Sequence, residues 1–243
     1  MIQVINVSKT YGKGTAAFQA LKDVSFEIPD GASVAIIGRS GSGKSTAMHA
    51  MSGLDRPETG QVIIDGQDIL RLPAKQVDAF RSQKMGFIFQ SFFVQADETC
   101  FANVSMPLEI AAFNDKDRTR LVEEALAKVE LSDKRNVKAR DLSGGQKQRL
   151  AIARAIVNSP RIIFADEPTG NLDTATGDVV EKLLFGFNKQ LGSTLIIVTH
   201  DPELAARCDM QIHVLDGKVE KITKSSQATM STQPSVVGAP HEI

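Results

Sequence analysis

The sequence predicts an α/β protein with a central parallel sheet, an antiparallel β subdomain and an inserted helical subdomain. Three short runs, at 34–37, 162–165 and 195–198, are fully apolar, which is typical of strands buried on both faces of a parallel sheet. Segments with helical character separate these strands, and such an alternation favours the α/β class. With 243 residues, of which 42% are hydrophobic, the chain suits one core domain with an insertion.

The N-terminal part of the chain contains the segments expected to form the antiparallel subdomain. Residues 2–7 and 24–28 have strand character and flank a loop centred on 12–14. The run at 33–38 is expected to be the first buried strand of the central sheet. Residues 61–69 alternate in polarity around an Asp-Gly pair, which predicts a hairpin arm in a half-exposed antiparallel sheet.

Residues 91–160 are expected to form a mainly helical insertion. Apolar residues recur at three- and four-residue spacing from 115 to 130, with charged residues on the other face, which predicts an amphipathic helix. A second helix is expected over 150–158, before Pro160. A third helix, over 177–190, separates the last two buried strands.

The chain after residue 222 differs in composition from the rest. Residues 223–243 are rich in Ser, Thr, Pro, Gln and Ala and contain no aromatic residue. A segment of this kind cannot bury enough apolar surface to form a core. We therefore expect one domain over 1–222, followed by a flexible C-terminal tail.

Composition and charge argue against several classes of protein. The formal net charge is −1, from 28 basic and 29 acidic residues, and no dense basic run indicates a nucleic-acid partner. Cys100 and Cys208 lack a CxxC partner, which argues against a disulfide or a cysteine metal site and fits a reducing cytosol. The N-terminus lacks the pattern of a signal peptide, and no apolar run is long enough to span a bilayer.

The sequence GRSGSGKS directly follows the first buried strand and precedes a helical segment. This context is typical of the phosphate loop of P-loop NTPases, whose core is RecA-like. Glycine lets backbone N–H groups converge on phosphate oxygens, and we expect Lys44 to reach the terminal phosphates and Ser45 to bind Mg²⁺. The residues expected to bind nucleotide here are Gly38, Arg39, Ser40, Gly41, Ser42, Gly43, Lys44, Ser45 and Thr46.

Two acidic residues follow the second buried strand. Asp166 comes at its carboxyl end, where ligands bind in open α/β sheets, and we expect it to hold Mg²⁺ through water. Glu167 would then orient or deprotonate the water that attacks the phosphate. Without the phosphate loop, an exposed acidic turn before Pro168 would be the simpler interpretation.

Three further residues are candidates for the same site. His200 follows the third buried strand, where it could stabilise charge in the transition state. Gln90 ends a short apolar run at 86–90 and could reach Mg²⁺ or the attacking water from the helical insertion. Tyr11, the only tyrosine, could stack on a nucleobase. For each of the three taken alone, an ordinary loop or surface role is the alternative.

The sequence LSGGQ, at 142–146, raises a separate question. Its two glycines behind a serine leave backbone N–H groups at the start of a helix, an arrangement that binds phosphate. The chain already has a phosphate loop at 38–45. The second loop therefore requires a ligand of its own.

The motifs of the chain, in their order, resemble those of the ATP-binding cassette (ABC) family over residues 1–222. LSGGQ is the most specific of them, because other P-loop NTPases lack it. The matching pieces are Tyr11, GRSGSGKS, Gln90, LSGGQ, ADE, the NLD at 171–173 and His200. The resemblance implies an ATPase that uses ATP and Mg²⁺.

The resemblance also implies what LSGGQ binds. Members of the family form head-to-tail dimers with two ATP molecules at the interface, so the expected partner is a second copy of the chain. Each LSGGQ would cap the γ-phosphate held by the other subunit. Asp173 would lie across the same interface. The residues expected to act in trans are Ser143, Gly144, Gly145 and Gln146.

Residues 48–60, FQSF at 89–92 and the NLD resemble one branch of the family. This branch (type VII, mechanotransmission-type) serves lipoprotein release, macrolide export, peptide-antibiotic resistance, haem efflux and cell division. The resemblance implies a membrane permease contacted through about 90–104, a location on the cytoplasmic face of the cell membrane, and a hydrophobic or amphipathic substrate such as haem, a drug, a peptide or a lipoprotein. One departure is Ala102, where this branch has glutamate, and it concerns the partner rather than the ATP chemistry.

Other ATPases of the family are the alternatives. A soluble ATPase without a permease, of the iron–sulfur assembly type, often has glutamate in place of Gln146. DNA-repair and chromosome-organising ATPases need a long coiled coil, and ribosome-bound translation factors need two cassettes; the sequence indicates neither. A binding module that does not hydrolyse ATP is disfavoured by the presence of Lys44, Glu167 and His200.

Overall fold

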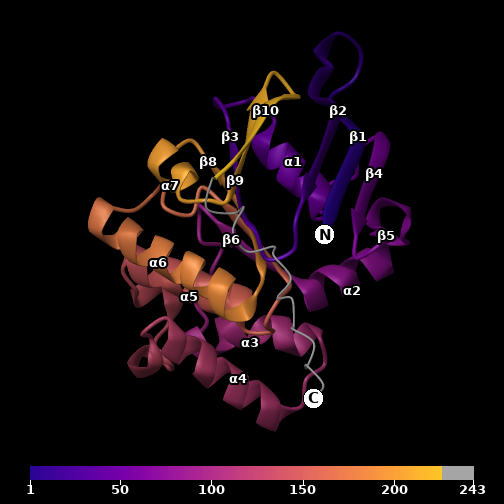
Figure 1. Ribbon diagram of the computed structural model, residues 1–243. Helices are drawn as coiled ribbons and strands as arrows, with labels where there is room; N and C mark the ends of the chain where they lie inside the picture. Colours follow the sequence, from indigo (N-terminus) through magenta and orange to yellow (C-terminus); the bar gives the residue numbers. More distant parts are fainter. Residues whose placement is uncertain (226–243) are drawn as a thin grey trace, which may run out of the picture.

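Two β-sheets and a helical region make up the fold, seen in a computed structural model that describes residues 1–225. The helical region lies at one end of the molecule, and the tip of the N-terminal hairpin lies at the other (Figure 1). The result confirms the α/β class, with a mainly parallel sheet, an antiparallel sheet and helices.

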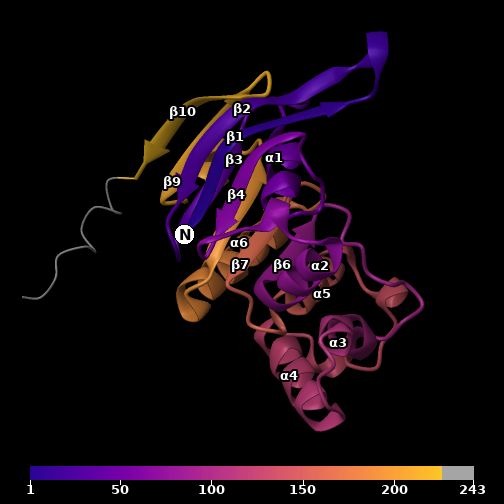
Figure 2. The ribbon, with the colours of Figure 1, turned by 90° about the vertical axis from the view of Figure 1, so that its right-hand side faces the viewer.

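The smaller sheet is antiparallel and has the strand order β2-β1-β4-β5. Its strands are β1 (Ile2–Tyr11), β2 (Phe18–Ile28), β4 (Thr59–Ile64) and β5 (Gln67–Asp68). The first two strands are longer than the segments predicted at 2–7 and 24–28, because their pairing continues to Tyr11 opposite Phe18. This end of the hairpin projects beyond the rest of the sheet (Figure 2).

The larger sheet has the order β10-β9-β3-β8-β7-β6. Its strands are β3 (Ser33–Ile37), β6 (Met85–Phe89), β7 (Ile162–Asp166), β8 (Thr194–Thr199), β9 (Met210–Leu215) and β10 (Lys218–Lys224). All neighbours are parallel except β10, which pairs antiparallel with β9 at one edge. Neighbouring parallel strands have their carboxyl ends at the same edge of a sheet. The carboxyl ends of β3, β6, β7 and β8 therefore lie at one edge of this sheet.

The central strands β3, β7 and β8 of the larger sheet are buried on both faces, as their apolar runs predicted. In β7, Ile162 and Phe164 face the core between the two sheets, whereas Ile163 and Ala165 face the helices on the other side. The helix α1 (Lys44–Met51) lies in the first core, and α5 (Gly144–Ile156) and α6 (Thr174–Leu191) cover the second. Strands covered on both sides lose the polar alternation of a half-exposed strand.

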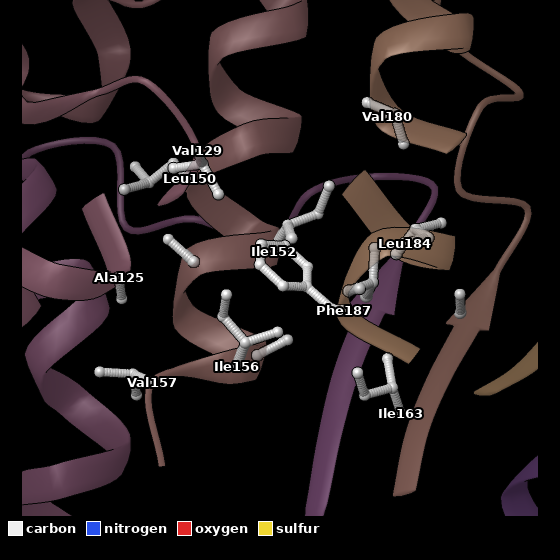
Figure 3. Close-up of a cluster of buried hydrophobic side chains, with 14 of the residues drawn as sticks. Ala125, Val129, Leu150, Ile152, Ile156, Val157, Ile163, Val180, Leu184 and Phe187 are labelled. Carbon is white, nitrogen blue, oxygen red and sulfur yellow. The ribbon is translucent and has the colours of Figure 1, made fainter. Parts of the chain in front are cut away.

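The second core is continuous from the sheet into the helical region. Ile152 of α5 and Leu184 and Phe187 of α6 gather near Ile163 of β7, and Ala125 reaches the same cluster from the far side (Figure 3). The remaining helices are α2 (Ala74–Lys84), α3 (Cys100–Ile110), α4 (Asp115–Lys128) and α7 (Pro202–Ala206). Short 3₁₀ turns occupy Gly14–Ala16, Ile69–Arg71, Ser132–Lys134 and Ala139–Asp141.

The helix α3 was not predicted from the sequence. Its residues are apolar on most sides, so they show no amphipathic periodicity. The helix begins at a cap in which the Thr99 hydroxyl accepts the N–H of Ala102 at 3.1 Å. A Ser/Thr cap is often completed by a Glu or Gln three residues later, and Ala102 cannot make that second bond.

The last strand changes one predicted boundary. β10 ends at Lys224, past the domain end expected at 222. Its antiparallel pairing with β9 was not predicted from the sequence. The flexible tail expected over 223–243 lies, from 226 on, outside the described residues.

Candidate active site

The phosphate loop connects β3 to α1, and its backbone requires glycine at two positions. Gly43 caps α1 with φ +106°, and a Cβ there would lie 2.4 Å from the Ala20 carbonyl oxygen. Gly41 has φ +75° and faces open space. A side chain would be strained at both residues, and at Gly43 it would also collide with β2. The loop therefore places bare backbone N–H groups at the N-terminus of α1.

The C-terminal hairpin braces the other end of this loop. A Cβ at Gly38 would lie 2.2 Å from the carbonyl oxygen of Val214 in β9. The N–H of Gly217 donates to the carbonyl of Ser42 at 2.9 Å, and the Gly217 carbonyl accepts the N–H of Lys22 at 2.7 Å. The loop is thus held between β2 and the β9–β10 turn.

Lys44 is buried without an acidic partner. Its side chain is folded back over the loop, where Nζ donates to the carbonyl of Arg39 at 3.0 Å, and the residue is only 7% exposed. None of the ion pairs among residues 1–225 includes Lys44. The Asp166 carboxylate acts on Lys44 only from beyond ion-pair distance, so the buried ammonium group remains available to bind an anion.

Asp166, the last residue of β7, faces the first turn of α1. The Ser45 hydroxyl donates to Asp166 Oδ1 at 3.2 Å. Burial raises the pKa of this carboxyl group, and the bond from Ser45 opposes the shift. Hydroxyl, carboxylate and amide oxygens are the ligands that Mg²⁺ prefers, so Ser45, Asp166 and Gln90 fit the donor set of a magnesium site.

Glu167 has an unusual backbone conformation and a histidine partner. Its φ is +46°, which is strained for a residue with a side chain. Its N–H donates to the carbonyl of Val198 at 2.9 Å. His200 Nδ1 lies 2.9 Å from both carboxylate oxygens, and Thr199 Oγ1 lies 3.5 Å from one. The carboxylate is mostly buried and the imidazole is exposed, so His200 covers Glu167 from the solvent side.

Gln90 reaches the site from the sheet and not from the helical insertion, which corrects the sequence expectation. It directly follows β6, the edge strand beside β7. Its Nε2 donates to Asn171 Oδ1 at 3.3 Å, and Asn171 Nδ2 donates to the Gln90 carbonyl at 2.9 Å. The sequence analysis gave Asn171 no role, and this reciprocal contact links Gln90 to the loop after Glu167.

These residues surround one cavity of ≈ 610 Å³ at the carboxyl edge of the central sheet. It is lined by Tyr11, Phe18, Ala20, Ser40, Gly41, Gly43, Lys44, Ser45, Thr46, Gln90, Asp166, Glu167 and His200. Gly38, Arg39 and Ser42 belong to the same loop without lining the cavity. The sequence therefore predicted most of the lining, and the structure brings these residues together.

Phe18 and Ala20 are lining residues that the sequence analysis missed. Phe18 lies opposite Tyr11 in the β1–β2 pairing, and both rings are exposed, at 58% and 41%. The Tyr11 hydroxyl donates to Asp55 Oδ2 at 2.6 Å, and Lys9 binds the same carboxylate at 2.7 Å. Burial and the Asp55 contact raise the pKa of Tyr11. Two aromatic rings at the cavity mouth can stack on a planar base.

The LSGGQ segment lies outside this cavity. Ser143 and Gln146 form a capping box, in which Ser143 Oγ accepts the N–H of Gln146 and Gln146 Oε1 accepts the N–H of Ser143. The N–H groups of Gly144 and Gly145 have no intrahelical acceptor at this end of α5. In the described part of the chain, none of residues 143–146 lines the cavity that contains Lys44.

Asp173 is committed to the start of α6. Its carboxylate accepts the N–H of Thr176 at 3.0 Å and the Thr176 hydroxyl at 2.8 Å, and these bonds lower the pKa of Asp173. Thr176 also touches LSGGQ, because a Cβ at Gly145 would lie 2.4 Å from Thr176 Cγ2. The structure therefore places Asp173 beside LSGGQ and outside the cavity.

A second cavity, of ≈ 410 Å³, opens between α2, β6, α3 and α5. Its apolar lining includes Met106 and Ile110 of α3, and Ile110 is 70% exposed. Residues 90–104, the expected contact segment, do not line it, although Phe93 packs edge-on against its Phe89 with ring centres 5.2 Å apart. The groove is an apolar surface without a partner in the chain described.

The helices of residues 1–225 include none with the length and apolar character to cross a membrane.

A model of the family described as "ABC transporter" matches residues 21–170. The lipoprotein-releasing system ATP-binding protein LolD of Syntrophotalea carbinolica is 42% identical over 219 residues, which cover 90% of this chain and 96% of that protein. An uncharacterized ABC transporter ATP-binding protein of Thermotoga maritima is 41% identical, with 92% and 95% covered.

Solved structures of ABC transporter cassettes are also similar to this chain. The dimeric structure of MJ0796, a bacterial ABC transporter cassette, superposes with a TM-score of 0.85 at 41% identity and covers 92% of this chain and 98% of that one. A dimeric post-hydrolysis state of MJ0796 bound to ADP and Pi also gives 0.85, at 40% identity with the same coverage. The cassette cbiO1 of Clostridium perfringens gives 0.82 at 28% identity, covering 95% and 90%.

Proposed function

The chain belongs to the ABC transporter family and is a transporter ATPase, and from this premise we propose that two copies close head to tail around two ATP molecules. The observation that carries the proposal is the separation of two phosphate-binding elements within one chain. Among the described residues, LSGGQ does not line the cavity at 38–45, and the N–H groups of Gly144 and Gly145 have no intrahelical acceptor at the start of α5. In a head-to-tail dimer, the phosphate loop of each copy faces the LSGGQ segment of the other copy.

In this proposal each residue of the cavity has a defined role. Tyr11 and Phe18 stack on the adenine ring, and the loop at 38–45 and Lys44 bind the phosphates. Ser45, Gln90 and Asp166 hold Mg²⁺, which when bound neutralises charge on the phosphate oxygens. The donor chemistry and the Ser45–Asp166 contact of 3.2 Å support this set.

Glu167 is the proposed general base for hydrolysis. Its carboxylate is mostly buried, stands beside the buried Lys44 pocket, and could take a proton from a water placed against the γ-phosphate. His200 would orient this carboxylate through its contacts of 2.9 Å and would stabilise charge on the phosphate. Ser143, Gly144, Gly145 and Gln146 of the facing copy would cap the γ-phosphate, and Asp173 would lie at the same interface.

The proposed second partner is a membrane permease, which places the chain at the cytoplasmic face of the membrane. The groove between α2, β6, α3 and α5 is apolar, with Arg81 and Arg154 in its lining, and suits a short amphipathic helix. The contact surface then includes this groove as well as 90–104. A relative that carries the name of a lipoprotein-releasing system favours an amphipathic substrate for the complex. The iron–sulfur assembly alternative has no comparable support among these relatives.

The experiment that tests the dimer uses Glu167→Gln. This change removes the base but leaves every phosphate contact, so turnover should fall by about 10²- to 10⁴-fold while ATP binding persists. With Mg-ATP the variant should elute as a dimer in light-scattering chromatography. The matched control is Glu124→Gln, an exposed carboxylate on α4, which should hydrolyse ATP and stay monomeric.

A monomeric Glu167→Gln protein that nevertheless binds Mg-ATP would contradict the head-to-tail proposal.

The same variant can identify the permease. Tagged protein is captured from detergent-solubilised membranes with Mg-ATP, and its partners are determined by mass spectrometry. A co-purified integral membrane protein supports the transporter complex, whereas only soluble partners would overturn the permease proposal.

A further inference from the structure

Gln148 is a buried polar residue that the proposed chemistry leaves unexplained. It lies on α5, two residues after the LSGGQ segment, and is fully buried. The residues that follow it on the buried face of α5 are apolar, beginning with Leu150. Its Nε2 donates to the carbonyl of Pro168 at 2.6 Å, and its Oε1 is buried with no partner among the described residues.

This arrangement is poor for stability alone. A buried amide oxygen without a hydrogen bond costs free energy, which offsets what the bond to the Pro168 carbonyl contributes. A well-placed polar group that lowers stability is typical of a site constrained by function. The single bond that Gln148 does make therefore indicates its purpose.

That bond ends on the residue next to Glu167. Glu167 has φ +46°, a strained conformation that persists only where its surroundings fix it. The Glu167 N–H donates to the carbonyl of Val198 in β8, and the Gly170 N–H donates to the Glu167 carbonyl within the turn. Asn171, farther along the same loop, is bonded to Gln90. Gln148 supplies the constraint that comes from the helix that begins at LSGGQ.

We infer that Gln148 is a positioning residue that transmits the position of α5 to the Glu167 carboxylate of the same chain. The coupling part of this inference rests on the proposed head-to-tail dimer. When LSGGQ binds the γ-phosphate of the facing copy, α5 is fixed, and through Pro168 it fixes the turn that carries Glu167. Each chain then aligns its own base in response to the ATP that its partner holds.

The test is Gln148→Met, which keeps the length of the side chain and removes both the donor and the unpaired acceptor. The change removes the unpaired Oε1 but also leaves the Pro168 carbonyl without its donor, so the thermal midpoint should change little, and the KM for ATP should stay within about twofold. The kcat should fall by about 10- to 100-fold, because a small misplacement of a catalytic group slows the chemical step. The proposed coupling makes the rate of the unaltered protein depend cooperatively on ATP concentration, and this cooperativity should be lost in the variant.

The matched control is Asn188→Leu, which removes a buried amide of α6 that donates to Gly31 and Ser193 carbonyls at 2.9 and 2.6 Å. This variant should lower the thermal midpoint and leave the kcat of the folded protein unchanged. An unchanged kcat in Gln148→Met would overturn the inference. So would a loss of stability that accounts for the lost activity.

A double variant separates this inference from the dimer proposal. Glu167→Gln with Gln148→Met should still form the Mg-ATP dimer, because Gln148 acts on the base and not on the clamp. Loss of that dimer in the double variant alone would place Gln148 in LSGGQ function and overturn the inference. If Glu167→Gln itself stays monomeric, the dimer proposal and the coupling fail, while kcat and thermal midpoint still decide the positioning role.

Discussion

The chain has two helix N-termini that expose glycine backbone, and they differ in their surroundings. At α1 the loop is held between β2 and the β9–β10 turn, with Lys44 buried beside it and a cavity of ≈ 610 Å³ in front. At α5 the side chains of Ser143 and Gln146 are occupied by their own capping box, and none of residues 143–146 lines the cavity that contains Lys44. The first N-terminus is a complete anion site, whereas the second is one wall of a site.

The largest expected effect comes from a change in the phosphate loop at the N-terminus of α1. Lys44→Ala removes the buried ammonium group that faces the phosphates, so ATP binding should weaken by at least about 100-fold, as expected for a desolvated charge contact. Isothermal titration calorimetry with Mg-ATP measures the loss. Lys75→Ala, at an exposed position of α2, is the control and should bind as the unaltered protein does.

Normal turnover in Lys44→Ala would refute the assignment of the phosphate loop. Lost thermal stability would not explain weak binding, because removal of an unpaired buried charge relieves a desolvation cost. A stable protein that no longer binds ATP is therefore the expected combination.

The second-largest expected effect comes from a change in LSGGQ that leaves the phosphate loop at 38–45 intact. Gly144→Ala adds a Cβ that meets no atom within 4 Å in the chain itself, so folding and ATP binding by the monomer should be unchanged. Turnover should fall by at least about tenfold, because the methyl group blocks the close approach of a facing phosphate. Gly186→Ala on α6, equally free of contacts, should retain full activity.

Mixing the two variants sharpens the comparison. A heterodimer of Lys44→Ala and Gly144→Ala subunits contains one composite site with both elements intact, so with Mg-ATP the mixture should form a dimer that retains one nucleotide, which neither variant forms alone. Absence of this dimer in light-scattering chromatography would show that LSGGQ does not act in trans.

The smallest expected effect concerns pH, because only the complete site buries a carboxyl group. Burial raises the pKa of Asp166 above its ordinary value of 3.8. The folded state therefore holds the proton more strongly, and stability falls as the pH rises through the raised pKa. Asp166→Asn removes this cost, so its thermal midpoint at pH 7 should exceed that of the unaltered protein.

The gain in Asp166→Asn should shrink as the pH falls and vanish below 3.8, where the carboxyl group is protonated in both states. Thermal scans over this range measure it. Asp133→Asn, an exposed carboxylate, is the control and should show no such gain. A lower midpoint for Asp166→Asn at every pH would contradict the argument.

Elements with strictly local signals were predictable from the sequence. The strands β3, β7 and β8 are short apolar runs because both of their faces are covered, and GRSGSGKS needs its glycines for backbone reasons. Residues at the ends of these strands meet because parallel strands share an edge. This logic located Lys44, Asp166, Glu167 and His200 in one cavity.

Features that depend on register or tertiary contact were not predictable. Phe18 joins the cavity only because the β1–β2 hairpin pairs it with Tyr11. Asn171 gains its role from contact with Gln90, and Gln148 stands in a polar stretch that gives no sign of its burial. The helix α3 was not predicted, because a helix that is apolar on most sides shows no amphipathic periodicity.

The bracing of the phosphate loop by the C-terminal hairpin has a consequence for synthesis. The Gly38 backbone lies against the Val214 carbonyl, and the Ser42 carbonyl accepts the N–H of Gly217, so the loop depends on contacts between residues far apart in the chain. A chain growing on the ribosome cannot complete these contacts until β9 and the turn after it have emerged. Its capacity to bind ATP therefore arises late, when nearly the whole domain is available to fold around the nucleotide.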